Sequence, residues 1–173
     1  MTLFGLKLSV DRTALPCSAA LWLVLTVAAA LLLRLPFGDA LILGLAATVL
    51  HWLSDIWHGL GHAFVARRIG HPMIGIRLRM IFAFSVYPQD EGDLPARIHV
   101  TRALGGPIAS VILTVALGVL LLLAAQGTLL WWLLFFGFLE NLLIFTAQVF
   151  VPLGFNDGAT LWKWVPKLLQ AHP

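Results

Sequence analysis

Cysteine is almost absent from this sequence, and charged residues are scarce. Cys17 is the only cysteine among 173 residues, which excludes a disulfide within the chain and any zinc site built from cysteine ligands. Charged residues make up only 11% of the sequence, whereas 60% of its residues are hydrophobic. Several apolar runs exceed 18 residues, enough to cross the roughly 30 Å hydrocarbon core of a bilayer. These features predict a polytopic membrane protein with a single domain, residues 1–173, and no soluble domain of any size.

Four apolar segments are predicted to cross the membrane as helices. They cover about residues 16–35, 39–68, 96–125 and 128–151. The apolar core of the first segment is too long for the hydrophobic region of a signal peptide, so we expect it to remain as an anchor. A short helix over about residues 157–170 follows the fourth segment. The predicted fold class is therefore an all-α polytopic membrane protein with four transmembrane helices.

The basic residues divide sharply between the two sides of this four-helix topology. Arg34 alone falls on one side, and the others fall on the opposite side: Lys7, Arg12, Arg67, Arg68, Arg77, Arg79, Arg97, Arg102, Lys163 and Lys167. Because Lys and Arg accumulate in cytoplasmic loops, both termini are predicted to be cytoplasmic. The formal net charge of +3 then reflects membrane orientation, and no nucleic-acid partner is expected.

The loop between the second and third helices has the pattern of β-strands. Ile74, Ile76 and Leu78 alternate with smaller or basic residues, which is the period of two expected of a strand. We expect a small β-hairpin at about residues 72–88, lying at the cytoplasmic face. Residues 3–10 also alternate and are a candidate edge strand. Because unpaired backbone cannot face lipid, these strands must pair with each other or lie in the interface.

Residues 58–62 read His-Gly-Leu-Gly-His, within the second predicted transmembrane helix. Histidines four residues apart lie on one face of a helix and can bind one metal ion. This is the spacing of the HExxH motif of zinc peptidases, in which the residue after the first histidine is the glutamate that acts as general base. Gly59 occupies that position here, so the chain lacks a carboxylate at this point of the motif.

Three segments resemble, in order, motifs of the site-2 protease family of intramembrane zinc metalloproteases. Residues 58–70, HGLGHAFVARRIG, are similar to the family's HELGHALAARRxG stretch, with glycine in place of glutamate. Residues 102–110, RALGGPIAS, are similar to its AGPLAN helix, with Ser110 in place of asparagine. Residues 149–158, VFVPLGFNDG, are similar to its NLLPxxPLDG segment. The resemblance extends over most of the chain, from the N-terminal strand to about residue 160.

The resemblance implies that His58, His62 and Asp157 bind zinc. Two imidazoles and one carboxylate leave a fourth position for water, which is the pattern of a catalytic zinc site. Asp157 begins the last predicted helix after an irregular stretch, so its carboxylate can point back into the helices. The alternative is that the two histidines are merely hydrogen-bonded in the interior and that Asp157 caps a helix before Gly158.

Further polar residues accompany the histidine pair. His51 and Asp55 continue its face of the second helix. Asp55 lies on the wrong side of His58 to replace the glutamate, and we expect it to accept a hydrogen bond from a histidine N–H and so fix its tautomer. Glu140 is expected to be a buried acid, paired with His51 or an amide and too deep to reach the metal. Asn141 fits another polar position that the resemblance assigns to the fourth helix.

The substitution at Gly59 decides the functional prediction. A general base contributes about 10²–10⁴ in rate, and glycine offers no proton acceptor. We therefore expect a site-2-protease-like pseudoprotease that keeps a possible zinc site and has little or no peptidase activity. Its expected partners are membrane lipids and a transmembrane helix of a substrate or partner protein. Gly59 would also allow a neighbouring helix or ligand to approach the backbone closely.

Three other functions are compatible with the sequence. One is an active intramembrane metalloprotease with a substituted base. Another is a non-catalytic structural subunit of a larger membrane complex, for which the tryptophans at 52, 57, 131 and 132 would provide contact surface. The third is a porphyrin-type cofactor site with His51 or His99 as the ligand. Metal analysis combined with a proteolysis assay distinguishes the pseudoprotease from the active enzyme.

Overall fold

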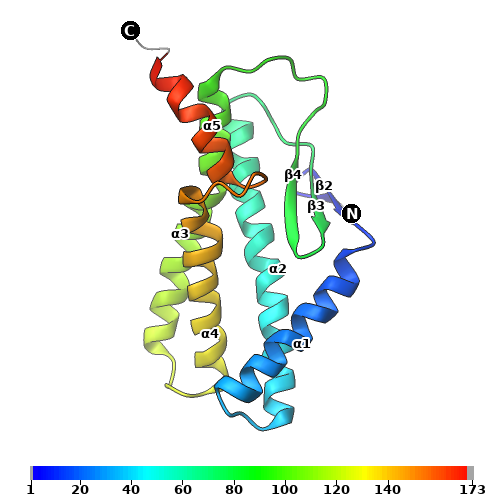
Figure 1. Ribbon diagram of the computed structural model, residues 1–173, viewed down its shortest axis with the longest axis vertical. Helices are drawn as coiled ribbons and strands as arrows, with labels where there is room; N and C mark the ends of the chain where they lie inside the picture. Colours follow the sequence, from blue (N-terminus) through cyan, green and yellow to red (C-terminus); the bar gives the residue numbers. More distant parts are fainter. Residues whose placement is uncertain (1, 171–173) are drawn as a thin grey trace.

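The computed structural model describes residues 2–170, and its framework is four long apolar helices (Figure 1). The first three are α1 (Ala14–Leu32), α2 (Phe37–Arg68) and α3 (Ala96–Leu123). The fourth begins as α4 (Leu129–Glu140) and continues as the π-helix η1 (Asn141–Thr146) and the 3₁₀-helix η2 (Ala147–Phe150). All four are long and apolar enough to cross a membrane. The prediction of a multi-pass protein with four such helices is confirmed.

The second helix is much longer than a bilayer core requires. Its 32 residues correspond to about 48 Å, whereas the hydrocarbon core is about 30 Å thick. A helix of this length must tilt in the bilayer or extend beyond its apolar region. The last turn of α2 carries Arg67 and Arg68. The opposite end follows the short connection from α1, which contains Arg34, and Figure 1 shows this connection at the foot of the molecule beside the connection of α3 and α4.

Two glycines allow α2 and α3 to approach closely. A Cβ atom on Gly61 of α2 would collide with the carbonyl oxygen of Gly105 of α3. A Cβ atom on Gly105 would lie 2.7 Å from the carbonyl oxygen of Gly61 and 2.9 Å from Cα of His62. Small residues at a crossing let two helix backbones meet, as is common between transmembrane helices. The crossing places the middle of α3 directly against the histidine pair of α2.

A four-stranded sheet lies beside the same half of α2 (Figure 1). Its order is β1 (Thr2–Leu3), β2 (Leu6–Val10), β3 (Gly75–Arg79) and β4 (Phe82–Val86). The strands β3 and β4 form an antiparallel hairpin, as predicted, with Gly75 opposite Val86. The strands β2 and β3 are parallel, with Lys7 opposite Gly75. The N-terminal segment was expected to supply one edge strand, but it forms a pair of strands because Phe4 and Gly5 reverse the chain with positive φ angles.

The sheet is attached to α2 by a small apolar cluster. Leu6 of β2, Ile76 of β3, Met73 and Ala66 of α2 are all buried together. Ile76 is the most enclosed large side chain of this group, with 1% of its surface exposed. The strand β3 is consequently fixed over the face of α2 that carries the histidine pair.

The fourth helix departs from regular α-helix immediately after Glu140. The wider π-helical turn begins at Asn141, whose side-chain amide donates hydrogen bonds to Oγ of Ser54 at 2.9 Å and to the carbonyl oxygen of Gly137 at 2.9 Å. Single π-helical turns within α-helices often occur at functional sites. After η2 the chain loops into the last helix, α5 (Asp157–Gln170), which packs against α3.

Candidate metal centre

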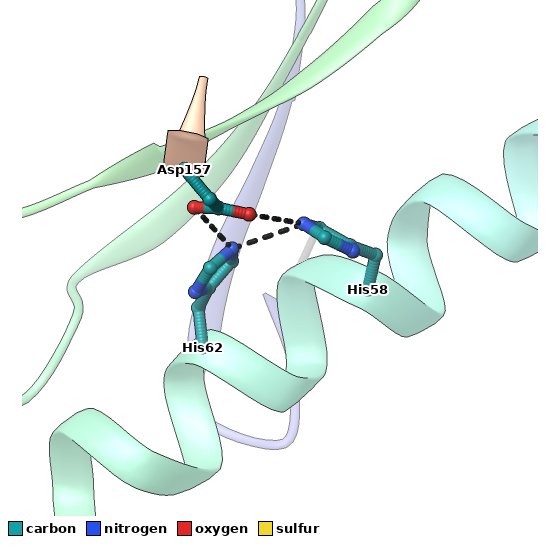
Figure 2. Close-up of side chains that lie close together, drawn as sticks. All are labelled: His58, His62 and Asp157. Atoms are coloured by element: carbon teal, nitrogen blue, oxygen red, sulfur yellow. Dashed lines mark hydrogen bonds and ion pairs between the residues drawn. The ribbon is translucent and has the colours of Figure 1, made fainter. Parts of the chain in front are cut away.

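Three side chains from two separate segments meet at the centre of the structure (Figure 2). His58 and His62 come from adjacent turns of α2, and Asp157 is the first residue of α5. Nε2 of His58 lies 3.0 Å from Oδ2 of Asp157, and Nε2 of His62 lies 3.2 Å from Oδ1 of the same carboxylate. The two Nε2 atoms are 3.1 Å apart. The structure therefore brings together the three residues that the sequence pointed to, and each offers one ligand atom within 4.8 Å of the others.

Asn156 holds Asp157 in this position. Its side-chain amide donates hydrogen bonds to the carbonyl oxygens of Gln148 at 3.2 Å and Val151 at 2.8 Å. Its Oδ1 accepts hydrogen bonds from the backbone N–H groups of Leu153 and Ala159, each at 3.0 Å. One side chain thus closes the loop between η2 and α5 and satisfies an otherwise free N–H at the start of α5.

Both histidines are oriented by acceptors on α3. Nδ1 of His58 lies 2.9 Å from Oγ of the fully buried Ser110, and Nδ1 of His62 lies 2.8 Å from the carbonyl oxygen of Arg102. The carbonyl oxygen of Arg102 can only accept, whereas the backbone N–H of Gly106 donates to the same Nδ1 at 3.2 Å. The shorter contact with Arg102 favours the proton on Nδ1, which would leave the lone pair of Nε2 for a metal. Ser110 can fix His58 in the same tautomer. Metal-binding histidines usually have the ring nitrogen that does not bind the metal held in this way.

The space beside the two Nε2 atoms is kept open by a glycine. A Cβ atom on Gly106 of α3 would collide with Nε2 of both His58 and His62. If both rings carry their protons on Nδ1, two nitrogen lone pairs and a carboxylate face one point and need a cation between them. Without a metal ion, protons on Nε2 that are donated to the carboxylate meet this need. The donor set of two imidazoles and one carboxylate is one that zinc prefers, with a further position left for another ligand. The residues present thus fit a zinc ion, although their role as metal ligands stays a prediction.

The carboxyl group of Asp157 is ionised at neutral pH. Burial by itself would raise its pKa, but hydrogen bonds with His58 and His62 and the charges of these rings outweigh that effect. Together they lower the pKa of Asp157 to about 2. The carboxylate is therefore available as an anionic ligand throughout the physiological range.

Comparisons with known proteins agree on one relationship. No protein-family model matches the chain. A protein of Methanocaldococcus jannaschii named "Putative zinc metalloprotease MJ0611" is 28% identical over an alignment of 134 residues, which covers 64% of this chain and 65% of that protein. The solved structure of the site-2 protease from Methanocaldococcus jannaschii matches with a TM-score of 0.59 and 19% identity over 99% of this chain and 71% of that chain. The chain is a site-2-protease-like membrane protein.

Within this site-2-protease fold, Gly59 faces an aliphatic side chain, whereas Gly61 faces the backbone of α3. A Cβ atom on Gly59 would lie 3.1 Å from Cδ1 of Ile76 and 3.6 Å from its Cγ1. The space next to the histidine pair on this side is thus occupied by β3. The glycine does not serve a helix crossing, which belongs to Gly61 and Gly105.

The polar residues deeper in α2 have roles other than ligation. His51 is within 2.6 Å of Glu140 through Nδ1 and within 2.8 Å of the carbonyl oxygen of Ile81 through Nε2. The pairing of Glu140 with His51 is one that the sequence suggested. Asp55 was expected to hold a histidine N–H, but its Oδ2 accepts the backbone N–H of Ala83. The two contacts to Ile81 and Ala83 hold the turn of the β3–β4 hairpin, and sequence patterns do not reveal such side-chain-to-backbone partners.

The two histidines suggested as porphyrin ligands make different contacts. Both ring nitrogens of His51 are engaged, as described above. The ring of His99 stacks on Trp164 of α5 with centroids 4.1 Å apart and planes at 9°. These contacts give His99 a packing role between α3 and α5.

Arg102 was not predicted as a site residue, yet it connects four parts of the structure. Its guanidinium forms a two-pronged ion pair with Glu91 and donates a hydrogen bond to the carbonyl oxygen of His71 at 2.7 Å. The same group lies 4.1 Å from the ring centre of Tyr87. The ion pair lowers the pKa of Glu91. Because its backbone carbonyl orients His62, Arg102 links the loop after β4 to the candidate metal centre.

A cavity of about 760 Å³ opens onto the three central residues. Its walls combine aromatic residues, among them Phe82 and Phe155, with polar residues that include Asp55 and Arg102. The rings of Phe82 and Phe155 lie 5.6 Å apart and join β4 to the loop before α5. The volume is within the range of pockets that hold a small molecule or part of a peptide.

Proposed function

We propose that this chain is a pseudoprotease with a site-2-protease fold, which holds a zinc ion and does not cleave peptide bonds. The contact of Gly59 with Ile76 supports the proposal most directly. In the motif that residues 58–62 resemble, the position of Gly59 carries the glutamate that removes a proton from the attacking water. Loss of such a base costs about 10²–10⁴ in rate. Ile76 places aliphatic carbon beside Gly59, so the side chain nearest to this position offers no carboxylate.

The zinc ligands in this proposal are Nε2 of His58, Nε2 of His62 and a carboxylate oxygen of Asp157. A zinc ion bound there would supply a Lewis acid that polarises a carbonyl group and lowers the pKa of a bound water to about 7. Ser110 and the carbonyl of Arg102 would keep both rings in the ligating tautomer. Gly106 would leave room for the ion. These residues can position and polarise a peptide without breaking it.

The proposed partner is a transmembrane helix of another protein, surrounded by membrane lipids. The loop between η2 and α5 supports this choice because it is strongly apolar and exposed. Val151 is 50% exposed, Leu153 is 57% exposed and Phe155 is 59% exposed. Leu153 and Phe155 also line the central cavity. An apolar segment that unwinds at the cavity could therefore be held by this loop and by Phe82, whose ring contacts that of Phe155.

The experiment combines metal analysis with a cleavage assay in lipid bilayers. We expect about one zinc ion per chain in the purified protein and none in Asp157→Asn. We also expect a labelled transmembrane-helix peptide to cross-link at Phe155 and remain intact by mass spectrometry. Turnover that is lost in Asp157→Asn would overturn the assignment as a pseudoprotease. A protein without zinc would overturn the metal-binding part.

One observation favours a second function, an active metalloprotease with a substituted base. Asp55 is a carboxylate that lines the same cavity as His58 and His62, and it would have to act from the side of His58 opposite to Gly59. Its contact with the N–H of Ala83 uses one oxygen. If the chain does cleave peptides, Asp55→Asn should reduce turnover by the factor expected of a general base, about 10²–10⁴. In the pseudoprotease, the same substitution should change only the anchoring of the hairpin.

We further propose that both termini are cytoplasmic, on the basis of the basic residues. The ends of α2 and α5 and the start of α3 carry most of them, whereas the connection of α1 and α2 carries Arg34. After Cys17→Ser, single cysteines can be introduced at Gly38 or Gly92. A membrane-impermeant maleimide applied outside intact cells should label the cysteine at position 38 and not the one at position 92. The reverse pattern would contradict this orientation.

A further inference from the structure

A second cavity lies outside the candidate metal centre, on the far side of the crossing between α2 and α3. Its volume is about 710 Å³. One wall is the end of α2, another is the middle of α3, and the third is the N-terminal turn at Phe4 and Gly5. In Figure 1 the N-terminal strands lie beside this half of α2. None of the residues that bind or orient the proposed metal belongs to its lining.

The cavity has the shape of a slot with a floor of small residues. Gly61, Gly105 and Ala109 form this floor, where the helices are in close contact. Larger side chains stand along the sides and are open to the surroundings: Trp57 is 42% exposed and Phe64 is 60% exposed. Gly61, Gly105 and Ala109 place no large side chain in the cavity, so the methylene groups of an acyl chain can pack against them.

One end of the slot is cationic. Arg67 is the only charged residue among the described residues that line it, and it is exposed at the end of α2. Next to it, the guanidinium of Arg68 lies 4.9 Å from the ring centre of Phe64, which is part of the slot. An apolar slot with arginines at the membrane interface is complementary to an acyl chain joined to a phosphate group.

We propose that this slot binds an anionic glycerophospholipid, with an acyl chain against Gly61, Gly105 and Ala109 and the phosphate at Arg67. Arg68 contributes a second cation above Phe64. Binding of this kind would brace the crossing of α2 and α3 from the side opposite the candidate metal centre. The positive charge at this end of the slot determines the lipid class. A zwitterionic headgroup would place its ammonium group near two guanidinium groups, which would repel it.

Trp57 provides a built-in reporter for the test. It lines the slot, and its Nε1–H donates a hydrogen bond to the carbonyl oxygen of Ala109 at 2.7 Å, so the ring is held in place. The full chain is reconstituted in phosphatidylcholine vesicles that contain a small, equal fraction of brominated phosphatidylglycerol or brominated phosphatidylcholine. Bromine quenches tryptophan on contact, and the signal of Trp57 is the difference between the wild type and Trp57→Phe.

We expect brominated phosphatidylglycerol to associate with the slot about fivefold more strongly than brominated phosphatidylcholine, the factor typical of one basic residue at a membrane surface. Arg67→Gln should remove most of this preference. The matched control is Arg34→Gln, which removes an arginine at the opposite end of α2 and should leave the preference unchanged. Native mass spectrometry should show a retained phosphatidylglycerol that is lost with Arg67→Gln.

Three results would overturn the proposal. Equal quenching by both lipids would show that the slot does not select charge. A preference that persists in Arg67→Gln would show that Arg67 does not cause it. Absence of quenching at Trp57 by either lipid would show that protein, for example a second copy of the chain, covers this face instead.

Discussion

Ile76 of β3 lies directly over Gly59 of α2, and its Cδ1 atom is 3.1 Å from the point where a side chain at position 59 would begin. Through this one methyl group, the sheet contacts the turn of α2 that carries the candidate metal ligands. It also affects how a carboxylate at position 59 could be accommodated, because Cδ1 would have to shift by a few tenths of an ångström within a side chain that is 1% exposed.

The first prediction concerns this pair. Gly59→Glu alone should give little activity, because the new side chain must displace Cδ1 of Ile76. The double variant Gly59→Glu, Ile76→Val removes that atom at a cost of about 0.5–1.5 kcal/mol in folding stability. We expect it to be the form most able to cleave a helical substrate in bilayers with zinc. The matched control is Gly59→Gln, Ile76→Val, which has the same shape without a base. Equal cleavage by both double variants would contradict the argument.

The second prediction concerns Gly106. Alanine at this position places a methyl group against Nε2 of both His58 and His62, where the ion would lie. Gly106→Ala should therefore lose zinc, measured as bound zinc per chain and as the visible spectrum of the cobalt-substituted protein. Gly38→Ala is the control, since a Cβ atom there meets nothing within 4 Å. Normal cobalt spectra in Gly106→Ala would show that the metal does not occupy this space.

The third prediction concerns the support of His58. Ser110→Ala removes the acceptor of its Nδ1–H group, and loss of such a partner usually weakens metal affinity about 10–100-fold. Competition with a zinc chelator measures the change. Thr114→Ala, one turn further along α3, deletes another buried hydroxyl that bonds only to the carbonyl oxygen of Ser110. It should leave the affinity for zinc unchanged, and a similar loss in both variants would indicate a general loosening of α3.

The fourth prediction separates stability from the metal centre. Glu140→Leu leaves His51 buried without its partner, and breaking a buried pair in this way typically costs about 3–5 kcal/mol. The thermal transition in lipid should fall clearly, while the zinc content of the folded fraction stays unchanged. Glu140→Gln keeps an acceptor for His51 and should lose much less. A loss of zinc from folded Glu140→Leu would mean that this pair does support the metal centre.

The periodicity of apolar residues was enough to predict the four long helices and the hairpin. The four apolar segments appear as helices with ends within a few residues of those expected, and the alternation around Ile76 corresponds to the β3–β4 hairpin. The spacing of His58 and His62 places both rings on one face of α2 because a helix turns once in 3.6 residues. Asp157 could be proposed only through a resemblance of motifs, since nothing local relates it to a residue almost a hundred positions earlier.

The remaining features depend on tertiary contacts that leave no pattern in the sequence. Asp55 has a backbone N–H of the hairpin as its partner, and any residue type except proline at Ala83 would offer the same group. Arg102 orients His62 through its own backbone carbonyl, which carries no signature of side-chain identity. The importance of Gly106 becomes visible only when the crossing of α2 and α3 is known.

The parallel pairing of β2 with β3 has a consequence for biogenesis. The backbone N–H of Lys7 bonds to the carbonyl oxygen of Ile74 at 3.0 Å, and the whole of α1 and α2 lies between these residues in the chain. Residues 6–10 leave the ribosome long before their partner strand exists, so β2 has no sheet to join until two helices have been inserted. Long-range strand pairing of this kind is slow and leaves unpaired edges exposed. The N-terminal strand should therefore be the last part of this half of the molecule to become protected from proteolysis during synthesis.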